Sequence, residues 1–350
     1  MKKMLKTLGL LALALCALIV SGCGGEKTAK RELKVYNAGD YIDPDLIKVF
    51  EKETGIRIIY DTWATNEDMY VKVKAGGSDY DLVIPSDYMI ERMRRENMLE
   101  KIDFTKIPNY ALIDEKFKNL YYDPQNEYSV PYMWGTIGII YNRKMVQEPV
   151  DSWAILWNPK YAKQIFIMDS LRDSIGMALK FRGYSLNASD DAALTAARDA
   201  LIAQKPLVQA YVVDEVKDKM IAGEGALAVV WSGDAVFMME KNPDLAYAIP
   251  KEGTNVWIDA MVILKGGKHK AEAEEFINFM TRPDIAKKNV EYIGYASPIP
   301  EVVRQLPPEV QADIASYPSE ALLKNSEFFH DLGDNLSKYD KVWTEVKVAK

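Results

Sequence analysis

Short apolar runs alternate along this chain with segments in which apolar residues recur every three or four positions. The runs predict strands and the periodic segments predict amphipathic helices. Strands are expected at 33–36, 56–60, 81–84, 136–141, 165–168, 226–231 and 256–264. Helices are expected at 44–54, 66–75, 88–96, 174–184, 190–204, 214–222, 270–280 and 284–291, and mostly helix is expected beyond Pro307. Strands separated by helices of this length predict an α/β fold with a parallel sheet and crossover connections.

The N-terminus has a different pattern. Three lysines within the first six residues precede an apolar run over 8–20, which is shorter than the roughly 20 residues that a membrane-spanning helix needs. A positive start, a short apolar core and small residues before Cys23 are typical of an export signal. Cys23 follows Ser-Gly and resembles the lipidated cysteine of bacterial lipoproteins; a plain secretory signal with a chance cysteine is the alternative. We expect a signal peptide over 1–22 and a lipid-anchored tether over 23–31.

Composition narrows the class of protein. Removing the signal takes away three lysines and no acid, so the net charge changes from −7 to −10. An acidic protein is not expected to bind nucleic acid, and it gently favours cationic solutes. The 328 remaining residues exceed the usual size of one core, so two lobes are expected. With one cysteine and two distant histidines (His269 and His330) left, neither a disulfide nor a metal site is expected, and no cofactor motif is present.

Carboxylates and aromatic rings follow the predicted strands, and ligands of open α/β sheets bind beyond the carboxyl ends of the strands. The candidate side chains at these ends are Asp40, Tyr41, Ser86, Tyr88, Asp173, Trp231 and Asp234. Trp257 and Asp259 are two positions apart in one strand and therefore project to the same face, and Tyr295 follows a late helix. Asp259 lies within an apolar strand with no lysine or arginine nearby in sequence on that face, although an unpaired buried carboxylate costs several kcal/mol. A ligand cation is a natural partner for it.

Acids beside rings suit an alkyl chain that carries ammonium groups. Rings cover methylenes and attract cations with about 0.5–2 kcal/mol each, and carboxylates form charge-assisted hydrogen bonds with the amines. Simpler explanations exist for single residues: Ser86 and Asp234 as helix N-caps, Trp231 as a core residue, and the tyrosines as rim residues. A glycosidase pair formed by Asp234 and Asp259 and a scaffold or adhesion lipoprotein are further alternatives. No nucleophile elbow, Cys/His pair or phosphate loop is present, so an enzyme is not expected.

Several motifs together resemble the spermidine/putrescine-binding proteins of bacterial ABC importers, from Val35 to about residue 335. They include Thr-Asn-Glu-Asp-Met-Tyr at 65–70, Tyr-Asp-Leu-Val-Ile-Pro-Ser at 80–86, Ser-Val-Pro-Tyr-Met-Trp-Gly at 129–135, Ser-Trp-Ala-Ile-Leu-Trp at 152–157, Trp-Ser-Gly-Asp-Ala at 231–235, Pro-Lys-Glu-Gly at 250–253, Phe-Ile-Asn-Phe at 276–279 and Ile-Gly-Tyr at 293–295. The resemblance implies a type II periplasmic-binding fold with a ligand cleft between two lobes. The implied lobes are 32–135 plus 258–303 and 136–257 plus 304–350, with hinge candidates near 134–138 and 250–255.

The resemblance also implies the ligand, the partners and the location. The ten candidate side chains above would contact a polyamine, putrescine or spermidine, without a cofactor, and another cationic or zwitterionic solute is the alternative. The protein would be a monomer, held by its lipid to the outer face of the cytoplasmic membrane or facing the periplasm. It would deliver the ligand to the membrane permease of an ABC importer.

Four positions bear on which ligand the implied site prefers. Ala38 stands where the family usually has tryptophan, and Phe329 stands where spermidine binders often have a polar contact. Asp173 replaces a glutamate that is one methylene longer, and Asp234 resembles the putrescine-binding branch. We therefore expect a wider or reshaped pocket, and the sequence leaves open which polyamine, or which other ligand, it prefers.

Overall fold

The part of the chain that the computed structural model describes, residues 31–76 and 79–349, is an α/β structure. The expected signal peptide, Cys23 and all of the tether except Arg31 lie outside these residues. The strands are β1 (Glu32–Ala38), β2 (Arg57–Trp63), β3 (Leu82–Val83), β4 (Leu99–Glu100), β5 (Ser129–Asn142), β6 (Ile165–Met168), β7 (Val208–Val212), β8 (Leu227–Trp231), β9 (Leu245–Ala248) and β10 (Val256–Leu264). The helices are α2 (Pro44–Thr54), α3 (Asn66–Lys74), α4 (Asp87–Arg95), α5 (Leu171–Phe181), α6 (Asp191–Gln204), α7 (Val216–Ile221), α8 (Ser232–Lys241), α9 (Lys270–Met280), α10 (Pro283–Ile293), α11 (Pro300–Gln305), α12 (Pro308–Gln311) and α13 (Leu336–Val348).

The sheet is mixed, with strand order β2-β1-β3-β10-β5-β8-β6-β7, while β4 pairs with β10 and β9 with β5. The expected parallel pairing is found for β1 with β2 and β3, and for β6 with β7 and β8. Strands β5 and β10 break this pattern, because β10 is antiparallel to β3 and β5, and β5 is antiparallel to β8 and β9. The expected parallel pairing is therefore correct on the two sides of the sheet and wrong for its central strands, β5 and β10.

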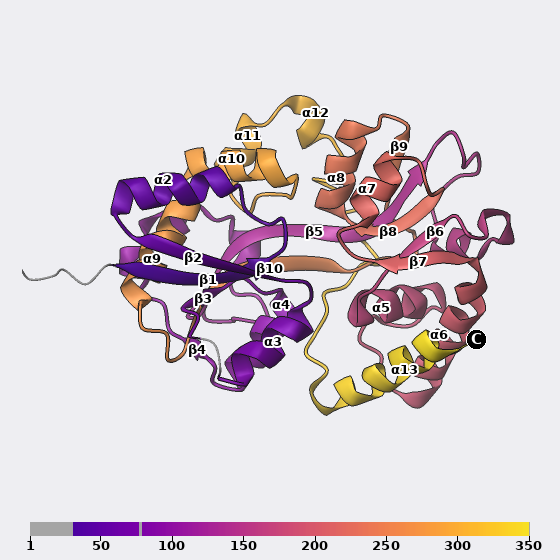
Figure 1. Ribbon diagram of the computed structural model, residues 1–350, viewed down its shortest axis with the longest axis horizontal. Coiled ribbons are helices and arrows are strands. Elements are labelled where there is room, and N and C mark those ends of the chain that lie inside the picture. Colours follow the sequence, from indigo (N-terminus) through magenta and orange to yellow (C-terminus); the bar gives the residue numbers. More distant parts are fainter. Residues whose placement is uncertain (1–30, 77–78, 350) are drawn as a thin grey trace, which may run out of the picture. The chain divides into compact units, whose positions relative to one another are not determined.

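Strand β5 connects two groups of strands (Figure 1). Its first half pairs with β10, and its second half pairs with β8 and β9. We call β1, β2, β3, β4 and β10 the first strand group, and β6, β7, β8 and β9 the second. All residues of β5 except Tyr141 are buried, as expected for a strand that is covered on both faces.

Local chemistry explains why many elements begin and end where the pattern predicts. In α2 the Asp43 side chain accepts a hydrogen bond from the Asp45 backbone N–H, Pro44 is the first helical residue, and Gly55 ends the helix with φ +71°. A carboxylate N-cap, a proline at the start and a left-handed glycine at the end are the usual helix boundaries. The same helix turns Leu46 and Phe50 into the core.

Tertiary contacts override the pattern in several places. Helix α5 begins at Leu171, three residues before its expected start, so Asp173 lies in the first helical turn. Strands β7 and β9 were not predicted, since each acquires its partner from a distant part of the chain. Between α12 and the short turn that precedes α13 the chain is not helical, contrary to expectation, and Glu327 forms backbone hydrogen bonds with Thr254 and Val256 there.

Among the residues described, no helix is both long enough and apolar enough to cross a membrane.

Candidate functional site

A cleft that is partly open to solvent is lined by residues at the carboxyl ends of β1, β3, β6, β7 and β8 and by two residues near the amino end of β10. All ten candidate side chains line it: Asp40, Tyr41, Ser86, Tyr88, Asp173, Trp231, Asp234, Trp257, Asp259 and Tyr295. Ala38 and Phe329, the two positions expected to reshape the pocket, line it as well. The geometry thus brings the candidate residues together, while their role as ligand contacts stays a prediction.

The sheet explains this convergence. The first strand group supplies the residues after β1 and β3 and two residues of β10, and the second group supplies the ends of β6 and β8. The two suggested N-caps are not side-chain caps: the Ser86 side chain makes no capping hydrogen bond at α4, and Asp234 lies inside α8. Both side chains face the cleft instead.

Asp259 has the chemistry of a cation-binding group. Its carboxylate is nine-tenths buried, and Oδ2 accepts a 2.6 Å hydrogen bond from the Tyr41 hydroxyl. Its other oxygen, Oδ1, is buried without a hydrogen-bond partner in the described part of the chain. Burial raises the pKa of Asp259 to about 6, although the hydroxyls of Ser86 and Tyr41 oppose the rise. Oδ1 is therefore open to a hydrogen-bond donor of a ligand.

Aromatic rings form a frame beside Asp259. Tyr295 meets Tyr41 edge to face, with ring centroids 5.3 Å apart, and lies 5.2 Å from Trp257. Gly233 permits this packing, because a Cβ at that position would lie 2.4 Å from the Tyr295 ring. The glycine of the Trp-Ser-Gly-Asp motif therefore has a steric function in the cleft.

Asp173 and Glu67 are two further acids that line the cleft. The Ser170 hydroxyl donates to the Asp173 carboxylate at 2.6 Å, and the Tyr88 hydroxyl donates to Glu67 at 3.0 Å. Burial raises the pKa of Asp173 to about 7, and the negative charge of Glu67 adds to the rise. Glu67 lines the cleft but was not among the predicted residues, although it lies in one of the quoted motifs.

Asp40 and Asp234 share a cation that sequence reasoning missed. The Lys217 ammonium lies 2.8 Å from Asp40, 3.3 Å from Asp214 and 3.8 Å from Asp234. Burial raises the pKa of Asp234 to about 6, and Lys217 opposes the rise. Nothing in the local pattern distinguishes Lys217 from Lys219, the other lysine of α7.

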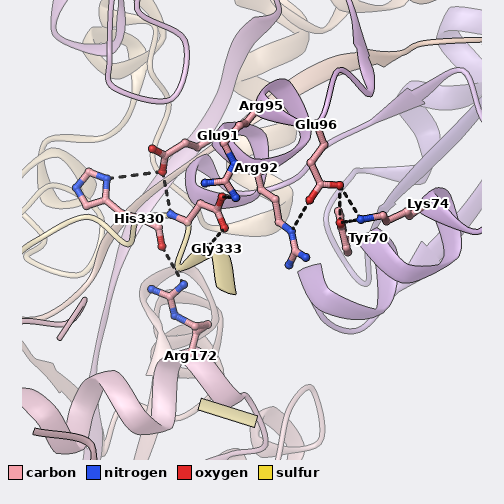
Figure 2. A network of polar contacts seen from close by, with 10 residues as sticks. Tyr70, Lys74, Glu91, Arg92, Arg95, Glu96, Arg172, His330 and Gly333 are labelled. Carbon is pink, nitrogen blue, oxygen red and sulfur yellow. Dashed lines mark hydrogen bonds and ion pairs between the residues drawn. The ribbon is translucent and has the colours of Figure 1, made fainter. Parts of the chain in front are cut away.

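Phe329 is held in place by a chain segment that passes between α4 and α5. Figure 2 shows Glu91 and Arg95 of α4 on one side of His330 and Gly333, and Arg172 of α5 on the other. Arg172 donates to the His330 carbonyl at 3.0 Å, and its guanidinium lies 4.3 Å from the centre of the Phe329 ring. The Phe329 ring also meets the Tyr88 ring of α4 edge to face, with centroids 5.8 Å apart, so residues of both helices pack against this wall of the cleft.

No group of three or more potential metal-ligating side chains occurs within 31–76 and 79–349. The side chains that line the cleft include acids, hydroxyls and aromatic rings, which suit an organic cation.

Comparison with known proteins defines the class. Residues 45–318 match the family of bacterial extracellular solute-binding proteins, and the chain belongs to that family. Its members bind solutes for transport and are not enzymes. The predicted type II periplasmic-binding fold and the expectation of a non-enzymatic protein are confirmed by the family and its structural relatives.

Several relatives are named for the binding or transport of spermidine and putrescine. The chain is 38% identical over 320 residues to the spermidine/putrescine-binding periplasmic protein of Escherichia coli K12, covering 91% of this chain and 92% of that one. A Listeria monocytogenes protein assigned to spermidine/putrescine ABC transport is 44% identical with a TM-score of 0.89, covering 91% and 100% of the two chains. The substrate-binding protein of the Streptococcus pneumoniae spermidine/putrescine transporter is 41% identical with a TM-score of 0.79, covering 91% and 99%. The resemblance inferred from the sequence motifs is confirmed.

Proposed function

We propose that this protein captures a polyamine, putrescine or spermidine, in the cleft and delivers it to the permease of an ABC importer. One observation carries the proposal: the buried Asp259 carboxylate has an unpartnered oxygen inside a cleft walled by acids and aromatic rings. An ammonium group satisfies that oxygen with a charge-assisted hydrogen bond. The relatives named above support the same solute class.

The remaining walls suit the rest of such a ligand. Trp231, Trp257 and Tyr295 offer flat surfaces to the methylene chain and attract the adjoining cations. An anionic solute is disfavoured, because six carboxylates line the cleft: Asp40, Glu67, Asp173, Asp214, Asp234 and Asp259. A zwitterionic solute is the second candidate, because Lys217 offers a cation near one end of the cleft to the anionic group of such a solute.

Capture is proposed to involve closure of two lobes, 32–135 plus 258–303 and 136–257 plus 304–350. Strand β5 and the segment that leads into β10 contain the proposed hinges, 134–138 and 250–255, and both connect the strand groups. Hinge closure around a ligand is common in periplasmic binding proteins. We further propose that the protein is a monomer, attached through a lipid on Cys23.

Calorimetry tests the proposal. The purified protein, freed of bound solute by unfolding and refolding, is titrated with putrescine, spermidine and spermine, and with glutamate and glucose as controls. We expect a dissociation constant in the micromolar range or tighter for at least one polyamine, about −8 kcal/mol, and no heat from the controls. Failure of all three polyamines to bind would refute the proposal.

A further inference from the structure

Lys217 is a cation held against the acids of the cleft by the protein itself. It lies on α7, its side chain is only 13% exposed, and its ammonium forms ion pairs with Asp40, Asp214 and Asp234. Burial lowers the pKa of Lys217, but the three carboxylates raise it more, so the net pKa is raised. Lys217 is therefore a permanent positive charge at this end of the cleft.

The three carboxylates come from both sides of the cleft. Asp40 follows β1 of the first strand group, while Asp214 and Asp234 follow β7 and β8 of the second. The side chains of the three acids line the cleft, and Lys217 approaches them without being a lining residue. Lys217 thus reduces the negative charge of these acids while leaving the space in front of them open.

Among the residues that the structure describes, no lysine forms an ion pair with the acids farther along the cleft. Besides burial, the negative charges of Asp234 and Asp259 raise the pKa of Tyr295. Besides burial, the negative charges of Glu67 and Asp259 raise the pKa of Asp173.

Side-chain contacts give the order of the acids from the Lys217 end, through Asp234 and Asp259 to Asp173. Tyr41 donates to Asp259 and packs on Tyr295, whose ring lies against Gly233, the neighbour of Asp234. On the other side of Asp259, its bridge to Ser86 leads to Tyr88, whose ring contacts Arg172, the neighbour of Asp173. The hydrogen-bond donors found for Asp259 and Asp173 are the neutral hydroxyls of Tyr41 and Ser170. The positive charge of Arg172 lowers the pKa of Asp173, whereas no cation of the described residues lowers the pKa of Asp259.

Lys217 offsets one of the three negative charges at its end of the cleft, and it already forms ion pairs with the acids that would hold an ammonium group there. The two ammonium groups of a diamine would instead be held by Asp259 and Asp173. The third ammonium of a longer polyamine would lie toward Asp234, where the charge of Lys217 repels it. Lys217 therefore lowers the attraction of this end for a third ammonium group.

We propose that Lys217 is a specificity-determining residue, which acts through Asp40, Asp214 and Asp234 to favour diamines over longer polyamines. This inference rests on the proposed function and names the ligand length that the same cleft selects. Lys217 lies on α7 and does not line the cleft, so the proposed selectivity comes from a residue behind the cleft wall.

The test compares the ratio of putrescine to spermidine affinity in three proteins by calorimetry at low salt. Lys217→Met removes the charge at similar length. Lys219→Met makes the same change in net charge on the same helix, at a side chain that pairs with Glu224 and does not line the cleft. We expect the wild type to bind putrescine at least as tightly as spermidine. Lys217→Met should shift the ratio toward spermidine by at least tenfold, and Lys219→Met should change it less than twofold.

Each outcome decides the proposal. A tighter affinity of the wild type for spermidine overturns it, and this measurement needs no variant to fold. An unchanged ratio in Lys217→Met, or an equal shift in Lys219→Met, also overturns it. If the wild type binds both polyamines and Lys217→Met leaves their affinity ratio unaltered, only the role of Lys217 is refuted. If the wild type binds neither polyamine, the proposed function is refuted.

Discussion

Replacement of Asp259 by asparagine separates ligand binding from folding. The side chain is nearly isosteric, and the amide oxygen still accepts the hydrogen bond from the Tyr41 hydroxyl. What changes is the charge of a group that is nine-tenths buried and has one unpartnered oxygen. Asp259→Asn therefore removes the partner of a ligand ammonium group with little change in packing.

We expect the substitution to weaken ligand binding and to stabilise the ligand-free protein. A hydrogen bond to a charged group contributes about 1.5–3 kcal/mol, so the affinity for putrescine should fall roughly 10- to 150-fold. Burial raises the pKa of Asp259 in the folded protein to about 6 from 3.8. The native state therefore binds more protons than the unfolded state between these pH values, and stability falls as the pH rises through that window. At pH 7 the asparagine variant, free of ligand, should be more stable by about 1–3 kcal/mol.

Two assays measure these effects. Calorimetry gives the affinity for putrescine, and denaturant unfolding without ligand gives the free energy of unfolding at pH 7. Asp199→Asn is the matched control, because Asp199 is an exposed acid of α6 that pairs with Arg198 far from the cleft lining. The control should change neither quantity appreciably.

Two results would refute this reasoning. Affinity within twofold of the wild type would show that Asp259 does not hold the ligand ammonium. A loss of stability in the ligand-free variant would show that the carboxylate is ionised and stabilising in the empty cleft, which contradicts the effect of its burial.

Four further predictions concern the cleft and the anchor. Binding of an ammonium group favours ionised carboxylates, and the pKa of Asp173 is raised to about 7, so binding should release protons and affinity should weaken as pH falls from 8 to 5; calorimetry in buffers of different ionisation enthalpy checks this, and a pH-independent affinity would contradict it. Gly233→Ala places a methyl group against the Tyr295 ring and should weaken putrescine binding more than tenfold and destabilise the protein by about 1–3 kcal/mol; an unaltered affinity would show that the ring frame does not matter. Ala38→Trp should change the ratio of putrescine to spermidine affinity, whereas an unchanged ratio would mean that this loop does not contact the solute. Cys23→Ser should abolish incorporation of labelled palmitate and release the protein from membranes, and continued membrane retention would rule out the lipid anchor.

Much of the fold was accessible from local pattern. Strands β6 and β10 and helix α9 have the bounds that periodicity predicted, because each is a continuous apolar run or a regular helical stripe. The candidate residues were accessible for a related reason. Side chains that follow parallel strands meet at one edge of a sheet, so strand ends predict a common site without any knowledge of distances.

Long-range pairing decided what the pattern did not contain. The antiparallel β5–β10 pair at the centre of the sheet joins residues more than one hundred positions apart. Glu327 lies beside Asn255 in an extended bridge, and its backbone bonds to residues 254 and 256 replace the helix that its surroundings predicted. Periodicity reports which face of an element is apolar, but it does not report which distant edge will accept its hydrogen bonds.

The order of residues was enough to predict the fold class, the export signal and the residues that gather at the strand ends. The charges within the cleft follow from the folded arrangement: Asp40 and Asp234 share Lys217, Glu67 lies near Asp173, and Asp259 keeps an oxygen without a partner among the described residues. The physical reason is that the environment of a carboxylate depends on burial and on cations within a few ångströms. The chain sets those distances only when it is folded.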